Sequence, residues 1–238
     1  MVLHPAQEAL IESYEDKKLF SKTTFTIIGR DFFRKGGLEV LRVFDRLFEA
    51  GQTQWQLNIV STLDYGDYAT FSTREAQVEA LQIIKKHSSH IHHFEQLKNT
   101  EVLTLLRNSH VGLLPTYADS YGYSVLEAQA CGCPCITTDI RALPEINNDD
   151  VGWSIKVPKN KAGNALIYSE SDRSRFSQII QEGLQSIIVH LLANEREIIE
   201  KGKSALVRIK KEHSPANNAR ILEGIYDEIL QRKTSTLD

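Results

Sequence analysis

The chain of 238 residues has the length of one large domain or two small ones, and 41% of its residues are hydrophobic and 25% charged. This ordinary composition excludes a disordered or collagen-like chain, and a net charge of −3 gives no support to a nucleic-acid binder. The sequence has no apolar run near the roughly 20 residues of a membrane span and no signal-peptide core after Met1. Three cysteines, all within residues 131–135, argue against a disulfide framework and for a reducing, cytoplasmic location.

Strand and helix patterns alternate through the first two thirds of the chain. Strands are predicted at 24–28, 55–60, 90–94, 111–115, 135–138 and 151–157. Helices are predicted at 38–48, from a capping box at 72–75 to about Lys86, after an Asn99 cap, and around 124–131. This alternation predicts an α/β fold: a mostly parallel sheet with helices on both faces.

The two ends of the chain depart from this pattern. Residues 1–23 contain no clear element and are expected to be a lead-in or interdomain segment before one domain at 24–230. Apolar spacing from about Ser171 to Leu230 predicts three C-terminal helices, with a polar tail at 231–238. The polar stretch 159–175 is predicted to be a disordered loop.

Three polar segments fall where predicted strands end, at 29–37, 94–99 and 115–124. Open parallel sheets bind ligands beyond the carboxyl ends of their strands. The first segment places Arg30 and Lys35 among glycines, which suits an anion such as a diphosphate; the alternative is a basic, solvated turn. It matches neither a P-loop nor a dinucleotide-binding glycine motif.

The segment after the fourth predicted strand is the most informative. Gly122 leads into a helix whose first-turn N–H groups and dipole favour an anion. Glu127 in that helix can accept hydrogen bonds from ribose hydroxyls, and Asp119 can face the same cleft from the loop. Two acceptors beside an amide-lined phosphate site indicate a nucleotide-sugar pocket.

Taken together, these motifs resemble the C-terminal, nucleotide-sugar-binding half of a GT-B glycosyltransferase of the retaining family 4 type. The family's Gly-Arg-x4-Lys-Gly loop is matched by Gly29, Arg30, Lys35 and Gly36. Its Glu-x7-Glu block and later Leu-Pro-Glu are matched by Pro115, Gly122, Leu126, Glu127, Ala128, Gly132, Pro134, Leu143, Pro144 and Glu145. The resemblance covers about residues 24–156 and implies a Rossmann-like domain.

The resemblance also implies a role for each matching position. Arg30 and Lys35 would neutralise the diphosphate leaving group, Asp119 would contact the sugar, and Glu127 would hold the ribose. The other implied donor contacts are Gly29, the backbone of Gly122, Tyr123, Ser124 and Val125, and, around the base, Phe94, Glu95, Gln96 and Leu97. Two positions depart from the family: Asp119 replaces a longer Glu, and Glu95 stands at a common Gly position.

The activity that the resemblance implies is transfer of a sugar from a nucleotide-diphosphate donor to an acceptor hydroxyl, with retention and without a metal or other cofactor. A carbohydrate or glycolipid acceptor would be held by an N-terminal domain absent from this sequence, so we expect the chain alone to bind nucleotide without transferring sugar. The alternatives are a GT-B-fold nucleotide-sugar epimerase or phosphorylase and a non-catalytic nucleotide-sugar-binding or regulatory module.

Several remaining residues have structural interpretations. We expect the histidines of 87–93 to be structural or solvated rather than metal ligands, and the cysteines and both tryptophans, Trp55 and Trp153, to pack in the core. The basic stretch 201–211 is predicted to be a solvated helix face; contact with an anionic membrane surface is the alternative.

Overall fold

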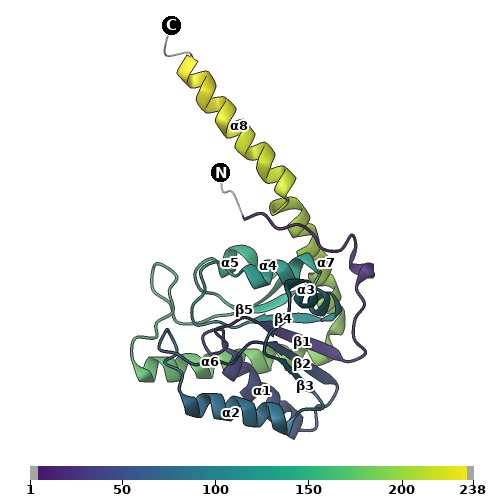
Figure 1. Ribbon diagram of the computed structural model, residues 1–238, viewed down its shortest axis with the longest axis vertical. Coiled ribbons are helices and arrows are strands. Elements are labelled where there is room, and N and C mark those ends of the chain that lie inside the picture. Colours follow the sequence, from purple (N-terminus) through teal and green to yellow (C-terminus); the bar gives the residue numbers. More distant parts are fainter. Residues whose placement is uncertain (1–4, 235–238) are drawn as a thin grey trace.

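The computed structural model describes residues 5–234, with side chains described as far as Leu230. Six parallel strands form one sheet in the order β3-β2-β1-β4-β5-β6 (Figure 1). The strands are β1 Thr23–Ile28, β2 Trp55–Val60, β3 Ile91–Phe94, β4 Val111–Leu114, β5 Cys135–Thr138 and β6 Gly152–Ile155. All six predicted strands are therefore confirmed, with ends that shift by a few residues.

Helices cover both faces of this sheet, as the sequence predicts. They are α1 Gly37–Glu49, α2 Arg74–Lys86, α3 Asn99–Asn108, α4 Tyr123–Ala130, α5 Leu143–Ile146, α6 Glu170–Ala193, α7 Glu195–Glu212 and α8 Pro215–Thr234. Helices α1, α2 and α6 lie below the sheet in Figure 1, α3, α4 and α5 lie above it, and α7 runs upward past the sheet from the end of α6. Helix α8 extends away from the body and ends four residues beyond the predicted Leu230, so part of the predicted tail is helical.

The predicted helix starts are near the observed ones, but two predicted caps are wrong by one residue. Thr73 rather than Ser72 caps α2, and the Ser72 hydroxyl instead bonds Gly66. Helix α3 begins at Asn99 itself, after Lys98, whose backbone N–H donates to Glu101. Neighbouring Ser, Thr and Asn residues have similar capping propensities, so tertiary contacts decide between them.

The prediction of a disordered loop at 159–175 is wrong. Lys159 and Ala165 form an antiparallel bridge, and the Asn160 side chain accepts hydrogen bonds from the backbone within the turn. Helix α6 already begins at Glu170, after Ser169, whose hydroxyl accepts from the Asp172 N–H. Local hydrogen bonds therefore order a segment whose polarity alone suggests disorder.

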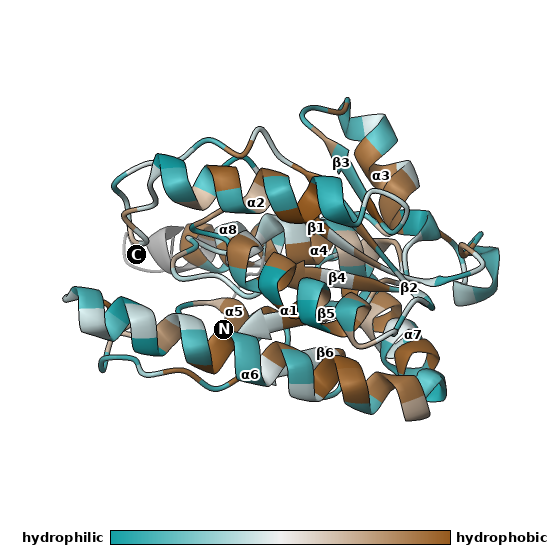
Figure 2. Ribbon diagram, turned by 90° about the horizontal axis from the view of Figure 1, so that it is seen from below, coloured by the Kyte–Doolittle hydropathy of each residue, from teal (hydrophilic) through white to brown (hydrophobic). Residues whose placement is uncertain are grey.

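The core is built where the apolar faces of the lower helices meet the sheet. The Phe25 ring on β1 lies 5.3 Å from that of Phe44 on α1 and 5.1 Å from that of Trp55 on β2. Both Trp55 and Trp153 are buried, as predicted. Figure 2 shows hydrophilic and hydrophobic segments alternating along α2 and α6, as expected of helices with one buried face.

Residues 5–22 run along the body beside α4 and α7, with one short 3-10 turn, Tyr14–Asp16. Tyr14 is buried there, the Leu10 N–H donates to Ala130 O at 2.8 Å, and the Lys17 ammonium donates to Cys131 O at 2.8 Å. The three cysteines at 131, 133 and 135 are buried and free, which confirms their packing role.

The order of the strands determines where on the sheet a ligand site is expected. Strand β1 pairs with β2 on one side and with β4 on the other, so the chain leaves β1 in one direction and later returns on the other side. The connections after β1 and β4 therefore diverge above the same point of the carboxyl edge, and such a switch point leaves a crevice for a ligand.

Candidate functional site

The loop after β1 (residues 29–37, the β1 loop) begins with Gly29, and the side chain of Lys35 packs directly against the backbone of this glycine. Gly29 has φ +146°, and a Cβ placed there would lie 2.2 Å from the Cε atom of Lys35. Only glycine fits that contact, so the Lys35 stem folds back over the end of β1. The alternative of a basic, solvated turn fits only one of the two cations: Arg30 is exposed, whereas Lys35 is mostly buried.

Lys35 meets the predicted acceptor of the loop after β4 (residues 115–122, the β4 loop). Its Nζ atom lies 3.2 Å from Oδ2 of Asp119, and the two side chains are 14% and 11% exposed. The other carboxylate oxygen, Oδ1, accepts from the Gly122 N–H at 2.8 Å. Asp119 therefore sets the position of Lys35 and of the start of α4, in addition to any contact with a ligand.

Arg34 ties the β1 and β4 loops into one unit. Its guanidinium donates to Ala118 O and pairs with Asp31, while its own carbonyl accepts from the Thr116 hydroxyl and the Tyr117 N–H, each at 2.9 Å. The two sides of the crevice are thus held together, which preorganises the groups that face a ligand.

The amino end of α4 faces the same crevice. Gly122 has φ +93° at the N-cap, and no side chain caps the first-turn N–H groups. Tyr123 is exposed and Ser124 half-buried, but the Val125 side chain is buried in the core and its N–H already donates to Gly122 O at 2.8 Å. Uncapped amides at a helix start are a favourable place for an anion.

Glu127 lies one turn into α4, close enough to Lys35 for their charges to interact. Burial raises the pKa of its carboxyl group, and the positive charge of Lys35 opposes that shift. Within the described residues, no group donates a hydrogen bond to this carboxylate, so it is available as an acceptor.

The other predicted contacts line an adjoining cleft of about 400 Å³. Its walls include Gly29 and Arg30 from the β1 loop and Glu95, Gln96 and Leu97 from the loop after β3. This volume lies in the range of small-molecule sites. The structure thus places Gly29, Arg30 and residues 95–97 in one cleft. Lys35, Asp119, Gly122 and Glu127 are grouped by their mutual contacts and charges, and the Lys35 stem joins this group to Gly29.

Phe94 is the predicted contact that lies outside this cleft lining. It ends β3, its side chain is half-buried, and its carbonyl accepts from the Ser61 N–H at 3.0 Å. This hydrogen bond extends the pairing of β2 and β3 at the carboxyl edge. Residues 95–97 follow Phe94 directly, so the same pairing fixes where they begin.

A buried carboxyl group beneath the β4 loop escapes sequence reasoning. Glu39, in the first turn of α1, is 5% exposed, and its Oε1 accepts from the Tyr117 hydroxyl at 2.7 Å and the Ser177 hydroxyl at 2.8 Å. Burial raises the pKa of Glu39, so its neutral form is favoured. A glutamate near a helix start ordinarily indicates only a favourable dipole interaction, so the sequence gives no sign of this buried contact.

Two of the histidines of 87–93 bond protein groups, and His92 is exposed. His87 Nε2 lies 2.7 Å from a carboxylate oxygen of Asp45, and His93 Nε2 lies 2.7 Å from Ser61 O. In the part of the chain that the structure describes, no three His, Cys, Asp or Glu side chains gather as a metal site would require. None of the described helices is both long and apolar enough to span a bilayer.

Comparison with known families gives a match over most of the chain. The family model described as "Glycosyl transferases group 1" matches residues 11–185. Over 61 residues the chain is 41% identical to N-acetyl-alpha-D-glucosaminyl L-malate synthase of Bacillus anthracis, a segment covering 25% of this chain and 16% of that protein.

Solved structures with the same fold are distant in sequence. The C-terminal domain of a glycosyl transferase group 1 family protein from Francisella tularensis matches with a TM-score of 0.59 and 19% identity, over 90% of this chain and 97% of that domain. Anabaena HepE in complex with UDP matches with a TM-score of 0.63 and 13% identity, over 87% of this chain and 49% of HepE. The chain thus spans about half the length of HepE, and at these identities the likeness shows the fold alone.

Proposed function

The chain belongs to the group 1 glycosyltransferases, and from that premise we propose that it is the donor-binding part of a retaining, family 4 type enzyme. It binds a nucleotide-diphosphate sugar at the switch point, and the enzyme transfers the sugar to a hydroxyl of a carbohydrate or glycolipid acceptor in polysaccharide or glycoconjugate biosynthesis. The observation that supports this most is the convergence of Arg30, Lys35, the uncapped start of α4 and the unpartnered Glu127 carboxylate.

Each part of the donor has a chemical counterpart in this arrangement. The base enters the cleft beside residues 95–97, and the ribose hydroxyls donate to Glu127. The diphosphate lies between Arg30, Lys35 and the amides of α4, where hydrogen bonds to charged groups contribute about 1.5–3 kcal/mol each. The sugar then points towards Asp119 and residues 122–125.

The same groups act on the reaction by stabilising the leaving group. Departure of the nucleoside diphosphate places new negative charge on the phosphate oxygen that leaves the sugar, and preorganised donors aimed at that oxygen lower the barrier. Arg30, Lys35 and the helix amides supply this charge stabilisation from protein groups alone, so the proposal requires no metal or other cofactor. A cytoplasmic location, with or without contact to the membrane surface, remains a prediction.

A thermal-shift panel tests donor binding. Purified chain is heated with UDP, GDP, ADP or TDP, each with and without EDTA. A nucleotide at 100 times its Kd should stabilise the fold by about 2.7 kcal/mol, and EDTA should not change the shift. The proposal is wrong if none of the four raises the melting temperature.

Transfer is tested separately with a radiolabelled donor and an acceptor mixture. We expect residues 1–238 alone to bind nucleotide but not to transfer sugar, because holding an acceptor in line contributes about 7–11 kcal/mol to lowering the barrier. Robust transfer by this chain would show that the acceptor site has been misplaced, while leaving donor binding intact.

A further inference from the structure

The connection between β2 and α2 (residues 61–73, the aromatic loop) is unusually long and strained. Loops in α/β units commonly have about 2–6 residues, and longer ones often have a function. Leu63, Ala69 and Phe71 adopt left-handed backbone conformations, with φ of +58°, +65° and +49°. Non-glycine residues persist in that region only where the surrounding structure holds them, so the loop has a fixed shape.

Specific contacts hold this shape. The Leu63 side chain is buried in the core, and its carbonyl accepts from the Gln77 side chain on α2 at 3.0 Å. The Ser72 hydroxyl accepts from the Gly66 N–H at 3.0 Å, which closes the loop on itself. The aromatic loop is therefore a preformed surface.

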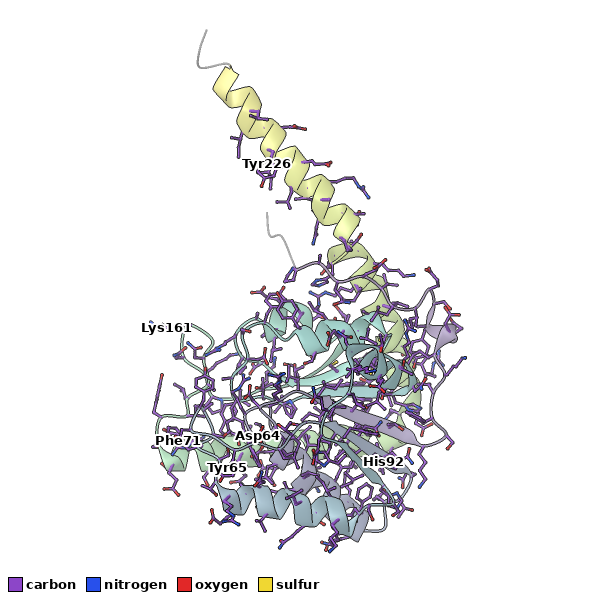
Figure 3. All side chains as sticks on the ribbon, in the orientation of Figure 1. Asp64, Tyr65, Phe71, His92, Lys161 and Tyr226 are labelled. Carbon is purple, nitrogen blue, oxygen red and sulfur yellow. The ribbon has the colours of Figure 1, made fainter. Side chains whose placement is uncertain are left out.

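Three aromatic side chains project from this surface into solvent. Tyr65, Tyr68 and Phe71 are 49%, 63% and 55% exposed. The Arg34 guanidinium lies 5.7 Å from the Tyr68 ring centre and the Arg173 guanidinium 4.5 Å from that of Phe71, so cation–π contacts orient two of the rings. Figure 3 shows Asp64, Tyr65 and Phe71 on the side of the molecule where the strands end.

Two of these rings, those of Tyr65 and Tyr68, border a cleft of about 100 Å³ between the aromatic loop and the β1 loop. Its lining combines the rings of Phe33, Tyr65 and Tyr68 with the carboxylates of Asp31 and Asp64 and the hydroxyls of Thr70 and Ser72. Asp64 also lines the proposed donor cleft, so the two clefts adjoin at that residue.

This combination selects for one class of ligand. An aromatic face is electron-rich and packs against C–H groups, whereas carboxylates and hydroxyls accept hydrogen bonds from hydroxyl groups. A sugar ring presents both, with apolar C–H faces and a rim of hydroxyls. The three carboxylates of Asp31, Asp64 and Asp67 exceed the two cations of Arg34 and Arg173, which disfavours anionic ligands. Asp31 pairs with Arg34 and Asp64 accepts from the Thr62 hydroxyl, but a carboxylate can accept several hydrogen bonds, and a purely apolar ligand would leave the remaining capacity unused.

We propose that the aromatic loop is a second carbohydrate-binding surface, which holds a neutral oligosaccharide beside the donor cleft. Its role in catalysis rests on the proposed function: the surface would hold an extended acceptor near the point of transfer. Binding of the oligosaccharide itself depends on the aromatic loop and on the adjoining Asp31 and Phe33, and does not require a bound donor.

The test compares two pairs of substitutions on the full chain with a matched control elsewhere. Tyr65→Ala with Tyr68→Ala removes two rings, and Tyr65→Phe with Tyr68→Phe keeps them without the hydroxyls. Tyr226→Ala removes a ring that is 62% exposed on α8, far from the loop (Figure 3). Maltopentaose, chitopentaose and mannopentaose are titrated by saturation-transfer NMR, and UDP is titrated into the same samples by calorimetry.

We expect at least one oligosaccharide to bind the unmodified chain and the alanine pair to weaken it about tenfold. The phenylalanine pair should retain most of the affinity, and Tyr226→Ala should leave it unchanged. Saturable binding of none of the three sugars, or equal binding by the alanine pair, would overturn the proposal. Failure of UDP to bind would count against the donor site instead, so the two results are distinguishable.

Discussion

Two regions of this molecule are rich in cations, and they differ in how many of those cations have partners within the protein. In the β1 loop, Lys35 pairs with Asp119, but Arg30 is exposed beside the donor cleft and makes no ion pair among the described residues. In α7, the basic segment (residues 201–211) has most of its cations occupied within the protein: Lys203 pairs with Glu15 and Lys210 with Glu12.

Two more cations of the basic segment follow the same pattern, whereas Lys211 is exposed and makes no ion pair among the described residues. Lys201 donates to Asp149 O and lies 5.4 Å from the ring centre of Trp153, and Arg208 pairs with Glu212 at 2.8 Å. The number of cations in a segment therefore says little about anion binding; the supply of nearby carboxylates and carbonyls decides it. The predictions below test this contrast.

The largest effect is expected from removing both cations of the β1 loop. Arg30→Ala with Lys35→Met should raise the Kd for a nucleoside diphosphate about 100-fold or more, since each charged hydrogen bond contributes about 1.5–3 kcal/mol. Methionine keeps the stem that packs on Gly29, although it leaves the mostly buried Asp119 without its cation. Calorimetric titration measures the change.

The matched control removes two cations from the other region, by Lys203→Ala with Lys210→Ala. Its nucleotide affinity should equal that of the unmodified chain. Arg30→Ala alone separates binding from folding, because that side chain is exposed. Equal affinity in the β1-loop double variant and the α7 double variant would refute the phosphate role.

A smaller, more selective effect is expected at Glu127. If its carboxylate accepts from ribose hydroxyls, Glu127→Gln should weaken a ribonucleotide about tenfold and its 2′,3′-dideoxy analogue much less. Titration of both nucleotides with both proteins measures this difference. Equal losses would assign Glu127 to the packing of α4.

The pH dependence of nucleotide binding by the unmodified chain and by Glu127→Gln makes that test more specific. Burial raises the pKa of Glu127 in the free protein, so its carboxyl group protonates earlier than usual as the pH falls. Acidification should therefore remove the advantage of the unmodified chain over Glu127→Gln, and raising the pH should restore it. A constant ratio of the two affinities over the titration range would show that the ionised carboxylate has no part in binding.

Sequence patterns predict the fold and much of the site because both depend on local signals. The alternation of apolar strands and amphipathic helices predicts the parallel sheet, and the rule that ligands bind at carboxyl ends brings the segments at 29–37 and 115–124 together. The identity of neighbouring caps, as at Thr73 in place of Ser72, depends on tertiary contacts that no local signal contains.

What the sequence does not predict depends on contacts between distant segments. The burial of Lys35 follows from its pairing with Asp119, 84 residues away, and Glu39 is buried because Tyr117 and Ser177 supply donors. The aromatic loop shows only scattered tyrosines and a phenylalanine in sequence; their common exposure at one edge becomes visible in three dimensions. The spacing of apolar residues along the chain cannot predict which distant side chains come into contact.

The smallest effect is expected from the basic segment of α7. Lys203→Ala with Lys210→Ala breaks two exposed ion pairs, which usually contribute little because water and salt screen them. The melting temperature should change by less than about 3 °C. Co-sedimentation with phosphatidylserine vesicles at about 0.15 M salt should show little binding by either protein, because the carboxylates of Glu12 and Glu15 already offset these cations. Strong sedimentation of the unmodified chain that the double variant loses would mean that α7 contacts anionic lipid, and the contrast between the two cationic regions would then fail.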